Sequence, residues 1–168
     1  KDKKKKPGTG TQGCMDYLFR LEEETGPVPD AIKALLITDG SVTRLLECFT
    51  GSPVQIRTIS QQVIPSPPDI AQEMQISAGD PVNHRVVEIC DGEVNIPLIH
   101  AVSYCPVERL PDHARISLMQ ADIPIGHILR DGKIESRREI TSIHMVPAGK
   151  CPPSLRNGRF HGRMFARS

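Results

Sequence analysis

Residues 82–104 read VNHRVVEIC, DGE and VNIPLIHAVSY, which are two apolar runs separated by a turn sequence. An Asp-Gly pair between two such runs is typical of a β-hairpin. Because side chains alternate between the two faces of a strand, Arg85 shares a face with Val87 and Ile89. If that face is the core face, the guanidinium is buried, and a buried charge is costly unless an anion pairs with it. The anion is either an acidic residue of the protein or a ligand, and the hairpin alone leaves both open.

The composition argues against several classes of partner. The formal net charge of +1 gives no general reason to expect nucleic acid or a membrane. Aromatic residues make up 4% of the chain and Trp is absent, which disfavours a surface that stacks on bases. No apolar run approaches the ~20 residues needed to cross a bilayer, and the polar N-terminus lacks the apolar segment of a signal peptide. The five Cys are scattered without a Cys-x-x-Cys pair, which favours a reducing, cytoplasmic setting.

Local signals predict helices in the first third of the chain. Residues 1–12, rich in Lys and Gly, are expected to form a disordered basic tail, with a solubilising role favoured over a nucleic-acid-binding one. We predict helices over 14–25, 30–37 and 42–50. Ser41 is suited to cap the third helix, and Gly51 is well placed to end it.

Strands are predicted to dominate the remainder. A strand over 53–64, a short helix near 69–75 and the central hairpin are followed by helical turns at 116–121 and 123–130 and by a strand over 133–145. The segment after this strand leaves room for one more hairpin arm. Because consecutive strands are joined by short connections, we predict an α+β fold, an antiparallel β-sheet flanked by helices on one side. Residues 13–168 are expected to form a single domain.

No catalytic motif of a serine hydrolase, a P-loop or a dinucleotide-binding fold is present. The six His are dispersed, so no metal site is expected, and Cys90 and Cys105 are interpreted as packing residues. Arg138 lies among isoleucines on its predicted strand, as Arg85 lies among apolar residues on its own. Either both arginines form internal ion pairs or reach the edge of the sheet, or their guanidinium groups bind a small carboxylate ligand through paired hydrogen bonds.

Five stretches, in this order, resemble one protein family: TDGSVTRLLE (38–47), GSPVQIRTISQQV (51–63), GDPVNHRVVE (79–88), AVSYCPVERLP (101–111) and ADIPIGHILRDGKIESRREI (121–140). They are similar to a mostly archaeal family, long known only as a domain of unknown function, that is related to the chorismate pyruvate-lyases, also called 4-hydroxybenzoate synthases. The resemblance covers roughly residues 30–145. The wider superfamily also contains the UTRA ligand-sensing domains of bacterial regulators.

The resemblance implies a chorismate lyase-like sheet with a ligand pocket closed by helical flaps. It implies cleavage of chorismate to 4-hydroxybenzoate and pyruvate with no metal and no cofactor. Arg85 matches the strand arginine that holds the ligand carboxylate and is the candidate catalytic residue. The remaining positions implied to bind substrate are Val42 and Thr43 in one flap, Ala101 beside the pocket, Ile125 and Gly126 in the Pro-x-Gly motif, and Arg138.

One part of the lyase pattern is missing. The lyases carry a glutamate on a late strand after a Gly-containing turn, whereas here Asn157-Gly158 is followed by RFHGRMFARS, with Phe165 at about the expected position. Glu135 and Glu139 are alternative carboxylates, although the predicted strand turns both outward. Two hypotheses therefore stand: a chorismate lyase-type enzyme, and a non-catalytic UTRA-like module that binds a small carboxylate. A homodimer is compatible with either.

Overall fold

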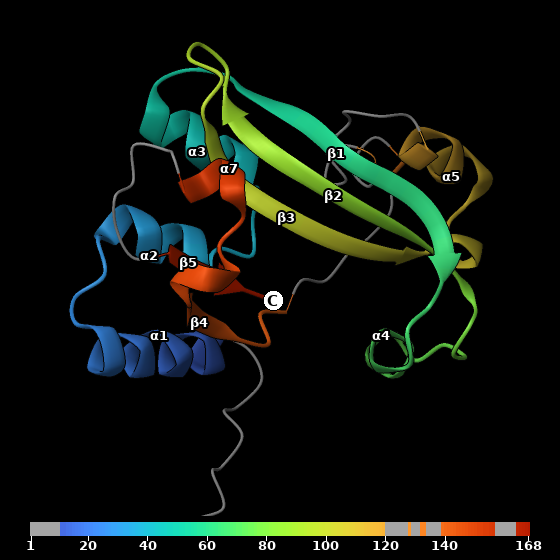
Figure 1. Cartoon of the computed structure of the whole chain (residues 1–168), viewed down its shortest axis with the longest axis horizontal. Coiled ribbons are helices and arrows are strands. Elements are labelled where there is room, and N and C mark those ends of the chain that lie inside the picture. Colours follow the sequence, from blue (N-terminus) through green and yellow to red (C-terminus); the bar gives the residue numbers. More distant parts are fainter. Residues whose placement is uncertain (1–10, 120–127, 129–131, 134–138, 157–163) are drawn as a thin grey trace, which may run out of the picture. The chain divides into compact units, whose positions relative to one another are not determined.

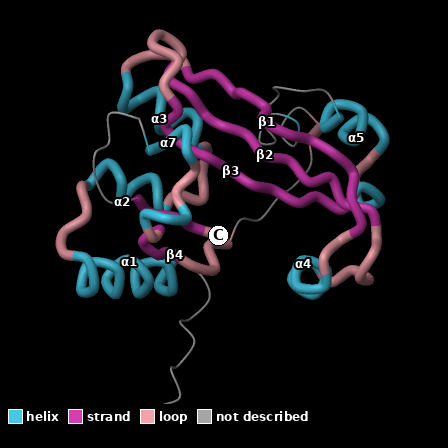
Figure 2. The backbone as a smooth tube through the Cα atoms, viewed as in Figure 1, coloured by secondary structure: helices cyan, strands magenta, loops and turns pink. Residues whose placement is uncertain are grey.

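The structure of this chain is a computed structural model that describes residues 11–119, 128, 132–133, 139–156 and 164–168. Two compact units are present, residues 1–51 with 137–168 and residues 52–136, and each is described by itself (Figures 1 and 2). The α+β prediction is confirmed, because helices accompany an antiparallel sheet. The expectations of a disordered tail over 1–12 and a single domain over 13–168 stay predictions.

The first unit contains helices α1 (Thr11–Thr25), α2 (Asp30–Ile37) and α3 (Val42–Thr50) and the strand pair β4 (Ile143–Val146) and β5 (Met164–Arg167). The short helices η2 (Ala148–Lys150) and α7 (Pro153–Arg156) lie between the two strands in sequence. Helix α1 begins three residues before the expected start. The caps of α3 are as predicted, since the Ser41 side chain accepts a hydrogen bond from the Arg44 N–H and Gly51 adopts the left-handed conformation.

The core of the first unit joins its helices to its strand pair. The buried apolar side chains are Leu18, Leu21, Val28, Leu36 and Ile143, and the half-buried Phe165 of β5 packs against them. Residues 139–142, predicted as strand, are irregular. The reason is that Thr141 and Ser142 direct their N–H groups to the Ser168 carbonyl rather than to a continuous ladder.

The second unit is organised by a three-stranded antiparallel sheet of β1 (Val54–Pro65), β2 (Pro81–Asp91) and β3 (Pro97–Pro106), with β2 in the centre. Helix α4 (Pro68–Met74) connects β1 to β2, and η1 (Val107–Arg109) and α5 (Asp112–Met119) follow β3 (Figure 1). Helix α5 packs through Ala114 and Leu118 against Ile128 and the half-buried Cys105 of β3. It begins before the helical turn predicted at 116–121, and the turn predicted at 123–130 lies outside the described residues except for Ile128.

The central hairpin is confirmed, but its loop is longer than expected. The second strand begins at Pro97 instead of Val94. The reason is local: the Asp91 carboxylate accepts hydrogen bonds from the N–H groups of Glu93 and Val94, and Asn95 takes a left-handed conformation with φ of 53°. An Asx turn of this kind holds the chain in a loop before pairing resumes.

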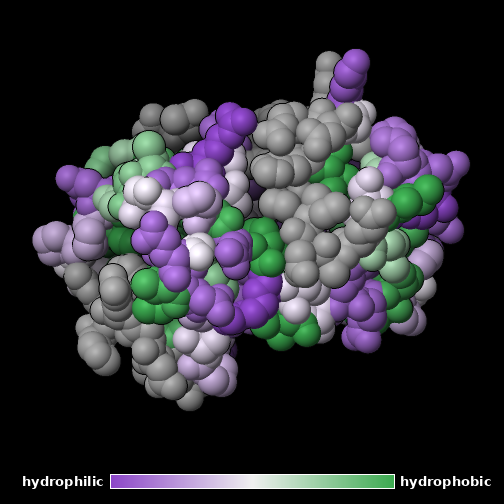
Figure 3. Space-filling model, turned by 90° about the horizontal axis from the view of Figure 1, so that it is seen from above, coloured by the Kyte–Doolittle hydropathy of each residue, from purple (hydrophilic) through white to green (hydrophobic). Residues whose placement is uncertain are grey.

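The surface mixes apolar and polar groups. Figure 3 shows hydrophobic residues interleaved with hydrophilic ones on the face in view. Within the described part of the chain, no helix is long and apolar enough to cross a membrane.

Gly92 allows the hairpin loop to approach the start of β1. Its N–H donates to the Pro53 carbonyl at 2.9 Å, and a Cβ at this position would lie 2.3 Å from that oxygen. We therefore expect Gly92→Ala to lower the free energy of unfolding by about 2 kcal/mol, measured by urea denaturation. Gly149→Ala is the control, because a Cβ there meets nothing within 4 Å. Equal unfolding midpoints for the two variants would contradict this account of the loop.

The Glu22 carboxylate is expected to make the stability of the first unit depend on pH. Its Oε1 accepts the Val28 N–H at 3.0 Å and lies 2.9 Å from Lys33 Nζ. The backbone hydrogen bond first, and the Lys33 ammonium second, hold the pKa of this carboxyl below its ordinary value. A lowered folded-state pKa gives stabilisation that is present above the unfolded-state pKa and is lost as the pH falls through the folded-state pKa.

We expect Glu22→Gln to lose stability at pH 7 and to differ less from the unsubstituted protein as the pH falls below about 4. Urea unfolding midpoints between pH 7 and pH 3 measure this. Glu23→Gln, at an exposed neighbouring position, is the matched control. A Glu22→Gln deficit that does not change with pH would show that the charge is not responsible.

Candidate functional site

One face of the central sheet carries Arg85. In the strand register, Arg85 lies opposite Gln61 of β1 and Ser103 of β3. The Arg85 residue is only 2% exposed, which confirms that its strand parity turns it inward. Its Nη2 donates to the Thr58 hydroxyl at 3.3 Å, and the Ser103 hydroxyl donates to the Arg85 carbonyl at 3.4 Å. The guanidinium thus lies in a buried setting with hydroxyl groups beside it.

The structure brings two of the predicted site residues together. Ala101 pairs with Val87, which is the next residue after Arg85 on the same face of β2. Arg85 and Ala101 are therefore diagonal neighbours on adjacent strands, with a small side chain next to the guanidinium. Val42 and Thr43 form the first turn of α3 in the other unit. Ile125, Gly126 and Arg138 lie outside the described residues.

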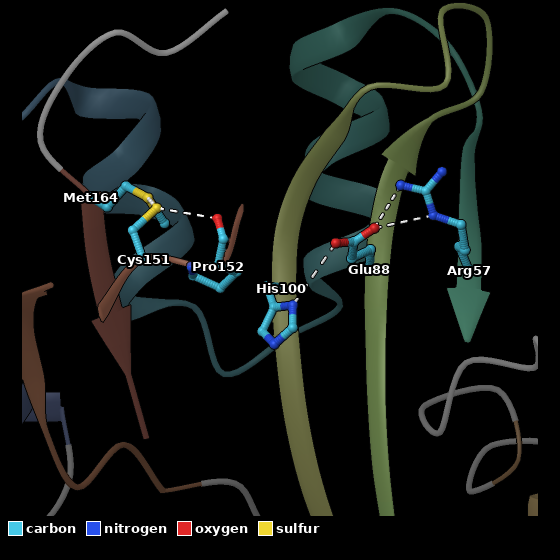
Figure 4. Close-up of polar contacts among 6 residues, drawn as sticks. All are labelled: Arg57, Glu88, His100, Cys151, Pro152 and Met164. Atoms are coloured by element: carbon cyan, nitrogen blue, oxygen red, sulfur yellow. Dashed lines mark hydrogen bonds and ion pairs between the residues drawn. The ribbon is translucent and has the colours of Figure 1, made fainter. Parts of the chain in front are cut away.

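The opposite face of the same sheet carries a charge cluster that the sequence analysis did not find (Figure 4). Glu88 is 3% exposed, and its Oε2 accepts hydrogen bonds from Arg57 Nε at 3.1 Å and Nη2 at 2.6 Å. Nδ1 of His100 lies 4.0 Å from the other carboxylate oxygen. The three side chains come from β1, β2 and β3, and the register pairs Glu88 directly with each of the other two.

This cluster compensates a buried carboxylate. The hydrogen bonds that Glu88 accepts hold the pKa of the Arg57 guanidinium above its ordinary value. Because Glu88 is an odd number of residues from Arg85, its carboxylate lies on the other side of the sheet from the guanidinium. Glu88 therefore does not lie on the face that carries the Arg85 guanidinium.

The thiols near the sheet are in environments that disfavour their reactive form. Burial raises the pKa of Cys90 and of Cys105, and Arg57 opposes this only in part at Cys90. A thiol rather than a thiolate is thus favoured, in keeping with a packing role. In the first unit, the buried Cys151 lies against the Met164 thioether and the Pro152 carbonyl (Figure 4). No three His, Cys, Asp or Glu of the described ranges are grouped so as to hold a metal ion.

A hollow of about 420 Å³ lies elsewhere, where the turn before β2 meets the end of β3. Its lining includes Asp80, Glu108 and Arg109, and none of the residues that face Arg85. The Arg109 guanidinium already donates to the carbonyls of Met74 and Gln75, at 2.8 and 2.7 Å. The acidic lining and the engaged arginine make this hollow a poor site for a carboxylate ligand.

The late strand offers no carboxylate among its described residues. Strand β5 carries Phe165, which packs against the apolar core of its unit. Glu139 is exposed and lies outside regular strand structure, and Glu135 is not among the described residues. Phe165, which the resemblance puts at about the position of the lyase glutamate, is thus used for packing.

The fold and the buried strand arginine define a class: an α+β protein built on an antiparallel sheet with a cationic group inside one face. Comparison with known proteins makes the class specific. Residues 36–167 match the family described as "Chorismate pyruvate-lyase Rv2949c-like", and the chain belongs to this family.

One curated relative supports the assignment. The chain is 35% identical over 125 residues to "Putative lyase MJ0807" of Methanocaldococcus jannaschii, which covers 71% of this chain. The chain spans about 59% of the length of that relative.

The Arg57–Glu88 pair makes a prediction about stability. Arg57→Ala is expected to lower the free energy of unfolding, because it leaves a buried carboxylate with less cationic compensation. Adding Glu88→Gln removes the charge and should recover at least half of that loss. Urea denaturation measures both, with Arg20→Ala on an exposed helix surface as the control. A double variant no more stable than Arg57→Ala would show that the carboxylate charge is not the cause.

Proposed function

We propose that this chain is a chorismate lyase-type enzyme that cleaves chorismate to 4-hydroxybenzoate and pyruvate. The observation that carries the proposal is the buried Arg85 side chain on the central strand. The family resemblance matches this arginine to the one that holds the ligand carboxylate in the lyases. Membership of the family and the name of the archaeal relative support a lyase. A planar guanidinium is suited to a carboxylate because it presents parallel N–H donors.

The proposed reaction asks little of the protein. The bond between the ring and the enolpyruvyl oxygen breaks, the ring loses a proton as it becomes aromatic, and the enolpyruvate released takes up a proton to become pyruvate. Aromatisation provides driving force, so the protein mainly has to orient the ring and manage these protons. Arg85 fixes one end of the ligand, and Ala101 gives the ring space. In this proposal Val42, Thr43, Ile125 and Gly126 contact the ring from the flaps, Arg138 binds a second anionic group, and no metal or cofactor takes part.

A second candidate is a non-catalytic module that binds a small carboxylate, as the UTRA-like domains do. The observation that favours it is Phe165, which occupies the late strand where the lyases carry glutamate. Both candidates use the same carboxylate site, and only turnover separates them. Assembly as a homodimer and a cytoplasmic setting belong to either proposal.

Purified protein is incubated with chorismate, and 4-hydroxybenzoate is followed by absorbance and chromatography. We expect turnover, and we expect Arg85→Ala to lower kcat/KM by about 100-fold or more, because a charged paired hydrogen bond to the carboxylate is lost. Arg85→Lys keeps the charge without the planar fork and should lie between the two. Arg20→Ala, at an exposed arginine, should leave kcat/KM unchanged.

Calorimetric binding of 4-hydroxybenzoate separates the candidates. Binding that depends on Arg85 without any turnover would replace the enzyme with the binding module. Turnover or binding that survives Arg85→Ala in a folded protein would remove Arg85 from both. Circular dichroism and the thermal midpoint establish that each variant is folded.

A further inference from the structure

Asn83 is a buried amide without a hydrogen bond. It is 1% exposed, and neither its Oδ1 nor its Nδ2 has a partner among the described residues. It lies two residues before Arg85, so both side chains are on the same face of β2. Buried amides in folded proteins are almost always hydrogen-bonded, and one left without a partner is costly. An amide retained in this state beside a buried guanidinium calls for an explanation.

Gln61 presents a second acceptor without a partner on the same face. It lies directly opposite Arg85 in the register, and its Nε2 donates to the Leu118 carbonyl of α5 at 2.6 Å. That bond fixes the orientation of the amide. The Gln61 Oε1 atom is buried and has no hydrogen-bond partner in the described part of the chain.

Helix α5 covers one end of this face. Cys105, which pairs with Asn83 in the register, packs against the cluster formed by Ala114, Leu118 and Ile128. The hydrogen bond from Gln61 to Leu118 joins the helix to the sheet at the same end. The amides of Asn83 and Gln61 are therefore placed between α5 and the Arg85 guanidinium.

We infer that Asn83, assisted by Gln61, binds a hydroxyl group of the same ligand whose carboxylate Arg85 holds. The inference rests on the proposed role of Arg85. A hydroxyl both donates and accepts, so it satisfies the Gln61 Oε1 or Asn83 Oδ1 acceptor together with the Asn83 Nδ2 donor. Residues two apart on a strand have Cα atoms roughly 7 Å apart, which suits a six-membered ring with the two groups at opposite ends. The ligand class is a small cyclic acid that carries a hydroxyl group far from its carboxylate.

The test compares two acids that share the carboxylate and differ in the hydroxyl. Calorimetry measures binding of 4-hydroxybenzoate and of benzoate to the unsubstituted protein, to Asn83→Leu and to Gln62→Leu. Gln62 is exposed on the other face of β1 and serves as the control. We expect the unsubstituted protein and Gln62→Leu to prefer 4-hydroxybenzoate by about tenfold or more. Asn83→Leu should lose this preference and keep its benzoate affinity within about threefold.

The thermal stability of the Asn83 variant distinguishes a ligand-binding role of this residue from a structural role. Leucine has nearly the shape of asparagine, and it removes two buried polar atoms that have no partner, so Asn83→Leu should unfold at a thermal midpoint at least as high as the unsubstituted protein. Gln61→Met, a second variant of similar length, should lower the preference for the hydroxyl by about threefold. A lower midpoint for Asn83→Leu would mean a structural role and would overturn the inference.

The outcomes tell failure of the role inferred for Asn83 apart from failure of the carboxylate site proposed at Arg85. Binding of both acids that depends on Arg85, with no preference for the hydroxyl or with a preference that survives Asn83→Leu, would overturn the role of Asn83 alone. Binding of neither acid, or binding that Arg85→Ala does not weaken, would overturn the carboxylate site and with it the inference. A preference lost only in Asn83→Leu and reduced in Gln61→Met supports both.

Discussion

The alternation of side chains along β2 is the constraint on which the rest of this sheet depends. It buries a guanidinium on one face and a carboxylate on the other, at Arg85 and Glu88, three residues apart. The two charges do not neutralise each other, because the backbone of the sheet lies between them. Each face must therefore accommodate its charge by separate means. Glu88 accepts hydrogen bonds from Arg57 on the neighbouring strand, whereas Arg85 shares its face with hydroxyl and amide groups from Thr58, Ser103 and Asn83.

The two faces of the sheet differ in how their buried charged side chains are stabilised. A buried carboxylate held by two hydrogen bonds from one arginine is a satisfied structural element, since the interior has already stabilised its charged form. The Glu88 face also has buried ring nitrogens without a hydrogen bond, at His84 and His100, but among the described residues only the Arg85 face combines unpaired amide atoms with a buried arginine. The second face is the one on which the small Ala101 lies. The proposed carboxylate site therefore lies on the Arg85 face, and Glu88 joins β2 to β1 through Arg57.

Features that depend on a few adjacent residues could be predicted from the sequence. Features that depend on which residues face each other across two strands could not. The caps of α3 at Ser41 and Gly51, the central hairpin and the inward direction of Arg85 each follow from a few adjacent residues. The Arg57–Glu88 pair is 31 residues apart in sequence, and only the register of β1 on β2 reveals it. The bulge between Thr58 and Ser60 shifts that register, so no count along the sequence would have found the partner. The strand predicted over 133–145 failed at residues 139–142 for a similar reason, since Thr141 and Ser142 pair with Ser168.

The amides near Arg85 are polar groups that a ligand can use even though the late strand lacks the glutamate of the lyases. Strand β5 uses Phe165 for packing, and in the proposed function the carboxylate of the ligand is held by Arg85 in the three-stranded sheet. There, Asn83 and Gln61 hold buried polar atoms in a state that costs folding free energy. Folded proteins tolerate such local conflict mainly at functional sites, where a ligand supplies what the fold leaves out. Neutral amides position a hydroxyl without binding the guanidinium themselves, whereas a carboxylate of the protein on this face would compete with the ligand's carboxylate for Arg85. In the proposed site, the uncharged amides beside the guanidinium therefore suit the hydroxyl group of an acid whose carboxylate binds Arg85.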